Sequence, residues 1–181
     1  LRVAAGADRP LLAAWLAAFA AETAQRIGSP PDLAADLIGY GGAVFWEAPD
    51  RQPAALATLT RPVARSVRIG IVYSPPERRR GGYASALTHA VSRAVLAGPG
   101  PADQGRALLA GASGPGRVDE VVIITDSSRP DRWGGRLGYE LVGERTVLRF
   151  GPATGAVPRL PTGRSPRLPT GPLPRPPRPG R

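Results

Sequence analysis

A turn of glycines and arginines is the segment of the sequence best suited to chemistry. The apolar run Ser66–Tyr73 leads into it, and Arg79-Arg80-Gly81-Gly82-Tyr83-Ala84 opens a stretch with helical periodicity. The first N–H groups of a helix have no internal acceptor and carry the positive end of its dipole. Glycines let a ligand approach these groups closely, and arginine side chains suit phosphate oxygens. The turn therefore predicts a site for a cofactor that carries a diphosphate.

Other common chemistries lack the residues they need. The chain has no cysteine and one histidine, His89, which excludes thiolate zinc sites, disulfides and thiol nucleophiles. A single histidine also argues against a Ser-His-Asp triad or a multi-histidine metal site, so we expect no metal. All 24 basic residues are arginine, which rules out the lysine of a Walker-type loop, and the dinucleotide-binding pattern GxGxxG is absent.

The elements that position the turn follow a mixed α/β order. Two helices come first, then three strands, then a helix, a strand, a short helix and a last strand. Their expected ranges are 9–27, 32–38, 43–47, 54–60, 66–73, 81–96, 120–125, 129–137 and 140–150. This order gives one parallel crossover after an antiparallel meander and argues against a doubly wound dinucleotide fold. The continuous apolar run at 120–125 predicts a strand buried on both faces.

Composition divides the chain into a folded part and a tail. Residues 1–150 read as one globular α/β domain, with a surface loop rich in Gly, Ala and Pro at 98–118. Residues 151–181 hold six arginines, ten prolines and no acid, which predicts a disordered extension. The repeated PRLPTG of this tail suits a proline-binding groove or an anionic surface. No aromatic residue interleaves its arginines, so we expect no nucleic-acid partner.

The N-terminal apolar stretch raises the question of export. Residues 11–21 follow two arginines, as in a signal peptide, but the large residues recur at the i, i+3, i+4 spacing of an amphipathic helix. No run reaches the ~18 apolar residues that span a bilayer. We therefore expect a cytoplasmic protein without a membrane partner. Since the chain opens with Leu1, we interpret it as part of a longer protein.

The turn and its surroundings resemble the GNAT family of N-acetyltransferases. Residues 79–84 match the family's acetyl-CoA signature Q/R-x-x-G-x-G/A, and VYSPPERRRGGYASAL at 72–87 resembles a bacterial subgroup that reads V-Y-T-P-P-E-x-R-G-x-G-Y-A. Downstream, the segments at 123–126, 135–139 and 142–143 are similar to the subgroup's final strand, helix and hairpin. The resemblance covers about residues 1–150. Similar domains often form the C-terminal half of a tandem GNAT chain, which implies an N-terminal GNAT half or a homodimer as partner.

The resemblance implies a fold, a co-substrate and a reaction. The fold would be GNAT-like, a central mixed, mostly antiparallel sheet flanked by helices, with strand four splayed from strand five. Acetyl-CoA would bind there, its pantetheine arm on the backbone of Val72, Tyr73 and Ser74. Its pyrophosphate would bind the N–H groups of Arg79, Arg80, Gly81, Gly82, Tyr83 and Ala84. A primary amine of a small molecule or protein would attack the thioester directly in a ternary complex.

The sequence departs from the family at the usual proton donor. Counting back from Tyr139, the position of the family's tyrosine holds Gly134, and the asparagine region at 128–132 is two residues short. We therefore name no catalytic residue. Three hypotheses stay open: an active acetyltransferase, an impaired GNAT-like domain that binds CoA or a partner without turnover, and a tail that recruits a partner.

Several single residues admit two interpretations. Glu47 would draw a proton from the amine through water or simply end a strand. Tyr73 would line the acceptor cleft or pack in the core. His89 is expected to be a surface or packing residue, Asp126 to cap a turn, and Tyr139 to lie in the core of the last strand.

Overall fold

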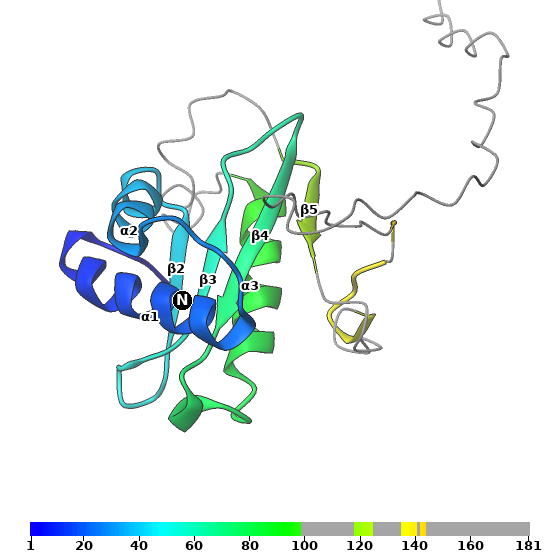
Figure 1. Ribbon diagram of the computed structural model, residues 1–181. Coiled ribbons are helices and arrows are strands. Elements are labelled where there is room, and N and C mark those ends of the chain that lie inside the picture. The colour runs from blue at the N-terminus through cyan, green and yellow to red at the C-terminus, as the bar shows by residue number, and fades with distance from the viewer. Residues whose placement is uncertain (99–117, 125–134, 141, 144–181) are drawn as a thin grey trace, which may run out of the picture. The chain divides into compact units, whose positions relative to one another are not determined.

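The computed structural model describes residues 1–98, 118–124, 135–140 and 142–143 (Figure 1). The chain separates into two units, Leu1–Leu141 and Val142–Arg181, and every described helix and strand lies in the first. The predicted tail at 151–181 lies outside the described residues, as do most of the predicted loop at 98–118 and of the predicted strand at 140–150. None of the described helices combines the length and apolar character that crossing a bilayer requires.

A five-stranded sheet with the order β1-β2-β3-β4-β5 forms the centre of the first unit. The strands from β1 to β4 pair antiparallel, and β4 pairs with β5 in parallel. The bounds are β1 (Arg2–Val3), β2 (Ala43–Glu47), β3 (Pro53–Leu59), β4 (Ser66–Tyr73) and β5 (Glu120–Ile123). The predicted mixed, mostly antiparallel sheet with one parallel crossover is therefore confirmed.

Two strands differ from the sequence expectation. The sequence does not predict β1, since two residues are too short to show an alternation, yet Arg2 and Val3 pair with Phe45 and Val44. The prediction that the strand at 120–125 is buried on both faces is wrong for its described part. Glu120 is exposed and residues 121–123 are half-buried, because the only described neighbour of β5 is β4.

Helices cover both faces of the sheet. In Figure 1, α1 (Arg9–Thr23) and α2 (Pro30–Gly39) lie in front of the sheet and α3 (Tyr83–Ala97) lies behind it. Single 3-10 turns precede α1 and α3, namely η1 (Gly6–Asp8) and η2 (Pro76–Arg78). The predicted helix at 9–27 ends early, at Thr23, because Ala24 takes a left-handed conformation with φ 52°.

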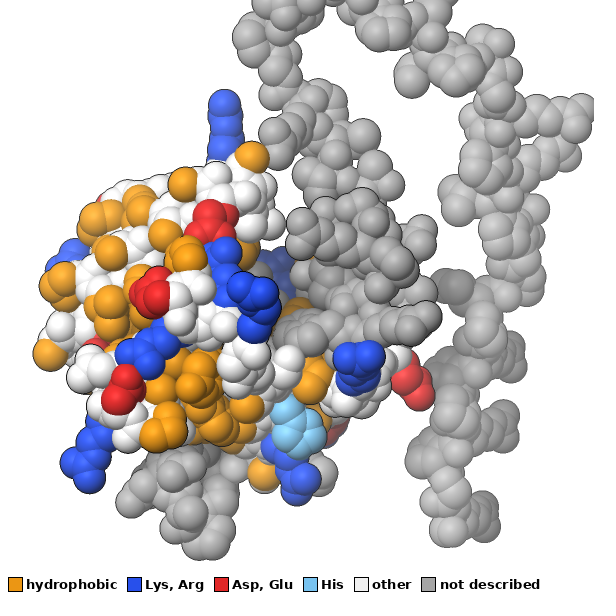
Figure 2. All heavy atoms as spheres, turned by 90° about the horizontal axis from the view of Figure 1, so that it is seen from below, with side chains coloured by type: hydrophobic (Ala, Val, Ile, Leu, Met, Phe, Trp, Pro, Cys, Tyr) orange, Lys and Arg blue, Asp and Glu red, His pale blue; other side chains and the backbone are white. Residues whose placement is uncertain are grey.

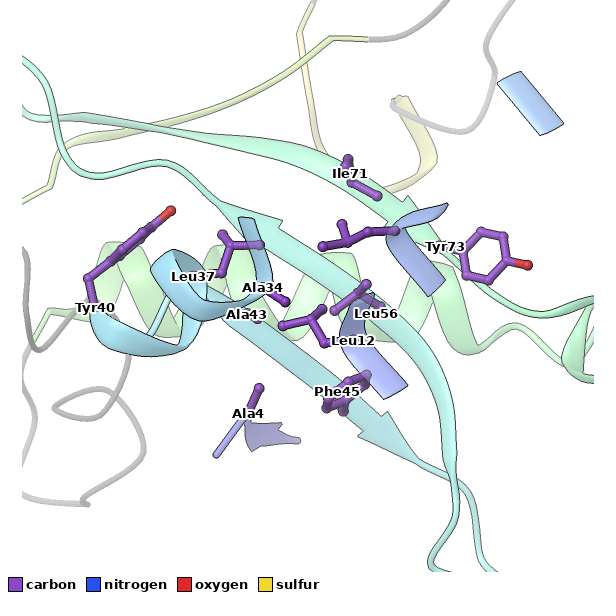
Figure 3. Close-up of a cluster of buried hydrophobic side chains, with 11 residues drawn as sticks. Ala4, Leu12, Ala34, Leu37, Tyr40, Ala43, Phe45, Leu56, Ile71 and Tyr73 are labelled. Atoms are coloured by element: carbon purple, nitrogen blue, oxygen red, sulfur yellow. The ribbon is translucent and has the colours of Figure 1, made fainter. Parts of the chain in front are cut away.

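The buried side chains form two separate clusters, one on each face of the sheet. We call the first the α1/α2 cluster; it contains Leu12 and Leu16 of α1, Leu37 of α2, and Phe45, Leu56, Ile71 and Tyr73 of the sheet (Figure 3). The second, the α3 cluster, contains Leu87, Val91 and Val95 of α3 and Val44, Ala57, Leu59, Val67 and Ile69 of the sheet. Each strand of the pair β2 and β3 alternates between the two clusters, as a strand buried on both faces must.

Strand β4 changes this alternation half-way along. Leu59 pairs with Ile69 and Ala57 with Val72, so Thr58 alone faces two residues of β4. This is a β-bulge, which inserts one extra residue and increases the local twist. Ile69 consequently belongs to the α3 cluster, whereas Ile71 belongs to the α1/α2 cluster although both have odd numbers. The bulge therefore turns the last residues of β4 over relative to the first.

Candidate functional site

The two parallel strands pair over only part of β4. The register runs from Ser66 opposite Glu120 to Ile69 opposite Ile123. Beyond this point, residues 70–73 of β4 have no partner on β5 within the described part of the chain. The bulge begins at the same place, and its added twist accounts for the divergence. The second half of β4 thus has one edge without a described strand neighbour, and that edge offers backbone groups for a ligand.

The glycine-arginine turn follows directly and leaves a row of backbone donors unused. The Arg79 amide donates to the Pro76 carbonyl at 3.3 Å, and the first bond of α3 runs from the Ala86 amide to the Gly82 carbonyl at 3.0 Å. Between them, the N–H groups of residues 80–84 donate to no backbone acceptor in the described residues. Arg80 and Gly82 have left-handed φ values of 63° and 77°, and such turns gather successive N–H groups around an anion.

A pocket opens at this row of donors. It is lined by Ser74, Arg78, Arg79, Arg80, Gly82, Tyr83, Ala84 and Ser85. The Ser74 Oγ atom is buried there and has no hydrogen-bond partner in the described part of the molecule. A buried hydroxyl without a partner is costly, so a ligand that bonded to it would remove that cost.

Most of the cofactor-binding residues expected from the sequence lie at this pocket. Ser74, Arg79, Arg80, Gly82, Tyr83 and Ala84 line it, and Gly81 is an exposed residue of the same turn. Val72 and Tyr73 do not line it: they belong to the α3 and α1/α2 clusters. Ser85 also lines the pocket, but it is not among the residues expected from the sequence. Its place in the first turn of α3, next to Ala84, was the signal that could have indicated it. The cofactor assignment stays a prediction.

The pocket's three arginines differ in their partners. Arg78 binds the Asp50 carboxylate at 2.7 Å, and Arg79 binds the Glu22 carboxylate at 2.6 Å. Glu22 raises the pKa of Arg79, and the pKa of Asp50 is lowered first by the Gln52 amide and then by Arg78. Arg80 forms no ion pair with any described residue. Figure 2 shows arginine and acidic side chains next to one another on one face of the molecule.

The ring of Tyr73 packs in the α1/α2 cluster, and its hydroxyl is directed toward the Glu22 carboxylate. Its ring meets Trp15 edge-on with centroids 5.8 Å apart, and the side chain lies at the margin of the cluster with its oxygen directed away (Figure 3). The hydroxyl donates to Glu22 Oε1 at 3.1 Å. Burial and then this bond raise the pKa of Tyr73. Tyr73 is therefore a protonated hydroxyl at neutral pH and no general base.

The other candidate residues are accounted for structurally where they are described. The Glu47 carboxylate accepts from Arg2 Nε at 2.8 Å, and Arg2 also binds Asp8, so Glu47 is held in an ion-pair network. His89 is an exposed residue of α3, the pale blue side chain of Figure 2, as predicted. Asp126 and Gly134 lie outside the described residues.

Tyr139 differs from its expected place in the core of a strand. It lies outside any described strand and is half-buried. Its hydroxyl is 2.6 Å from Ser92 Oγ, which itself donates to the Thr88 carbonyl at 2.7 Å. Tyr139 therefore donates to Ser92, and burial raises the pKa of its hydroxyl. Sequence reasoning missed this contact because the partners are far apart in the chain and have no shared motif.

Comparison with solved structures identifies the arrangement. An integron cassette protein from the mobile metagenome of Cole Harbour Salt Marsh superposes with a TM-score of 0.57 at 16% identity, over 85% of this chain and 91% of that chain. A ribosomal-protein-alanine N-acetyltransferase from Brucella melitensis biovar Abortus 2308 gives 0.51 at 15% identity, over 81% and 96%. A protein described as a probable acetyltransferase gives 0.54 at 13% identity, over 82% and 95%.

The chain has the GNAT fold. The identities are low, so the likeness concerns the fold alone, and it agrees with the mixed sheet and the open edge of β4 described above. A scan of protein-family models gives no match. A search of the curated proteins gives none either. Within the GNAT fold, the glycine-arginine turn at the start of α3 is the feature of this chain that most favours an anionic ligand.

Proposed function

We propose that this chain transfers an acetyl group from acetyl-CoA to a primary amine of a small molecule or a protein. One observation carries the proposal: residues 80–84, whose N–H groups donate to no described backbone acceptor, form a turn beside an arginine-lined pocket, just beyond the part of β4 that has no described partner on β5. The GNAT fold supports the same reaction class, since two of the similar structures are described as acetyltransferases.

The pocket fits the diphosphate of CoA. The amides of residues 80–84 and the Arg80 guanidinium have no acceptors among the residues that the structure describes, and a diphosphate supplies acceptors with negative charge. The Ser74 side chain lines the same pocket, and its hydroxyl has no hydrogen-bond partner among the described residues. The backbone of Val72, Tyr73 and Ser74 would pair with the amide groups of the pantetheine arm, as an added strand pairs with a sheet edge.

Acetyl transfer by this route requires three contributions from the protein. The amine must be neutral, the oxygen of the attacked carbonyl must be stabilised, and the leaving thiolate must gain a proton. Neither Tyr73 nor Glu47 is free for this work, because Tyr73 donates to Glu22 and Glu47 is paired with Arg2. We assign none of the three roles to a residue.

A second candidate function is CoA binding without turnover. The sequence favours it at one position, where Gly134 replaces the tyrosine that GNAT enzymes usually provide. Glycine has no side chain that carries a proton. An impaired domain would still bind CoA in the pocket but would not transfer the acetyl group.

Calorimetry and thiol release separate the two functions. The chain has no cysteine, so a thiol reagent reports only the CoA that is set free. Titration with CoA and acetyl-CoA is expected to give one binding site, and incubation of acetyl-CoA with a panel of amines is expected to release thiol. Binding without thiol release would favour the impaired domain. No binding of either compound would contradict both functions.

A further inference from the structure

Glu22 connects the pocket to a helix on the other side of β4. Its Oε1 accepts from the Tyr73 hydroxyl at 3.1 Å, and its Oε2 accepts from Arg79 Nη2 at 2.6 Å. Glu22 belongs to the last turn of α1, whereas Arg79 follows η2 and lines the pocket. One carboxylate thus joins α1, the end of β4 and the glycine-arginine turn.

Besides its bond to Glu22, the Arg79 side chain makes two contacts at the end of β4. Its Nε donates to the Ser74 carbonyl at 2.9 Å, and its guanidinium lies 5.7 Å from the centre of the Tyr73 ring. The bond to Glu22 is the only described contact of Arg79 with an anion. The Glu22 carboxylate therefore engages a guanidinium donor that is equally suited to a phosphate oxygen.

The ion pair is exposed enough to exchange. The side chains of Arg79 and Glu22 are 42% and 40% exposed. Pairs with this exposure contribute little to stability, because water and salt screen them. A diphosphate carries more charge than one carboxylate and also reaches the free amides beside Arg79, so it competes well for the same guanidinium.

We propose that Glu22 competes with the ligand's diphosphate for Arg79, so that binding moves Arg79 from the carboxylate to a phosphate oxygen. The inference rests on the proposed function, which supplies the diphosphate. Glu22 keeps its bond from the Tyr73 hydroxyl after the exchange and stays at the end of β4. It acts as a positioning residue that lowers the affinity of the pocket through Arg79.

A double-mutant cycle tests this competition. We would titrate the wild type, Glu22→Gln, Arg79→Gln and the double variant with CoA and, separately, with inorganic pyrophosphate. Removing the competing charge is expected to raise the affinity of E22Q for both probes by about twofold to fivefold. In the Arg79→Gln background the same change is expected to have no effect, because there is no guanidinium left to compete for.

Glu77→Gln is the matched control. Glu77 is an exposed acid of η2, two residues from Arg79, and it has no described partner. Its removal changes the net charge near the pocket equally, so it corrects for long-range attraction. Urea denaturation of each variant checks that the domain remains folded.

The titrations test the competition by Glu22 separately from the proposed function. A gain for E22Q above that of E77Q, with both probes and only when Arg79 is present, supports it. An equal gain for the two variants, a loss for E22Q, a gain limited to CoA, or a gain that persists without Arg79 overturns it while leaving CoA binding intact. Failure of the wild type to bind CoA overturns both this inference and the proposed function.

Discussion

The amide of Ile71 donates a hydrogen bond of 2.9 Å to the side-chain oxygen of Thr58. Both residues are buried, and Thr58 is the residue of β3 that faces two residues of β4. In a regular ladder a backbone carbonyl would accept from this amide, but the bulge moves the carbonyl out of reach. The Thr58 hydroxyl accepts from this amide instead. It thereby stabilises the bulge, beyond which β4 no longer pairs with the described residues of β5.

Thr58→Val is expected to destabilise the domain and weaken the pocket. Valine has the same shape but leaves the buried Ile71 amide without an acceptor, at a cost of about 1–3 kcal/mol in the free energy of unfolding. CoA affinity is expected to fall as well, because the bulge sets the open edge of β4. Urea denaturation and calorimetry measure the two effects.

Thr60→Val is the control for that variant. Its hydroxyl accepts from the Arg68 amide at 3.1 Å in an exposed position, where water replaces the lost acceptor. We expect a loss below about 0.5 kcal/mol there. Equal losses for the two variants would contradict a special role for Thr58.

Arg80→Gln is expected to lower the affinity for CoA by about fivefold to tenfold, because a charge-assisted bond to phosphate is replaced by a neutral one. The effect should shrink as salt is added. Arg51→Gln is a matched control: Arg51 also has a left-handed backbone, with φ 61° against 63° for Arg80, and lies in the β2–β3 turn outside the pocket. A similar loss in both variants would show that only net charge matters.

Gly82→Ala is expected to lower both stability and ligand affinity. Gly82 caps α3 at φ 77°, a conformation that costs an alanine about 1 kcal/mol, although a Cβ there meets no atom within 4 Å. Relief of this strain would rotate the free amides away from the pocket. Gly28→Ala, where space is equally open and φ is not left-handed, controls for the loss of glycine flexibility. Calorimetry with CoA and urea denaturation report the two quantities, and unchanged affinity in G82A would contradict the role of the turn.

The Asp8–Arg2 pair predicts a pH dependence of stability. The bond from Arg2, at 2.6 Å, holds the pKa of the Asp8 carboxyl below its ordinary 3.8. A carboxyl with a lowered pKa in the folded state stabilises the fold above its unfolded pKa, and this contribution is lost as the pH falls through the folded pKa. Asp8→Asn keeps one acceptor oxygen for the Ala5 amide, removes the charge and replaces the second oxygen that accepts from Arg2 with an NH2 group.

The cost of D8N is therefore expected to be on the order of 1 kcal/mol at pH 7, allowing for solvent screening, and to diminish below about pH 4. Urea denaturation between pH 7 and pH 2 measures it. In the Arg2→Gln background the dependence of the cost on pH should become smaller, leaving the part that comes from the Ala5 amide. A cost for D8N that stays constant with pH would show that the pair is not the cause.

Much of this fold is predictable from patterns that depend only on residues close together in the sequence. The strands at 43–47 and 66–73 have the observed bounds, since β-branched and aromatic runs between turn residues act over a few neighbours. The glycine-arginine turn was likewise readable, because the donors of a helix start and the freedom of Gly82 depend on adjacent residues alone. The pocket that gathers these residues follows from the same short segment.

The sequence pattern does not predict features that depend on residues far apart in the chain. Buried residues alternate along β4 at 67, 69, 71 and 73, which a regular strand would place on one face. The register against β3 divides them between two faces, and register depends on a second strand. Glu22 lies 57 positions from Arg79, so no spacing in the sequence indicates their contact.

The two buried clusters share no side chain, since one lies between the sheet and α1/α2 and the other between the sheet and α3. A change of side chain on α1 or α2 must be accommodated by its own layer and need not disturb the packing beneath the glycine-arginine turn. The buried residues of α1 and α2 are therefore free to vary in evolution without repacking α3, whereas Glu22 on the same helix is tied to the glycine-arginine turn through Arg79.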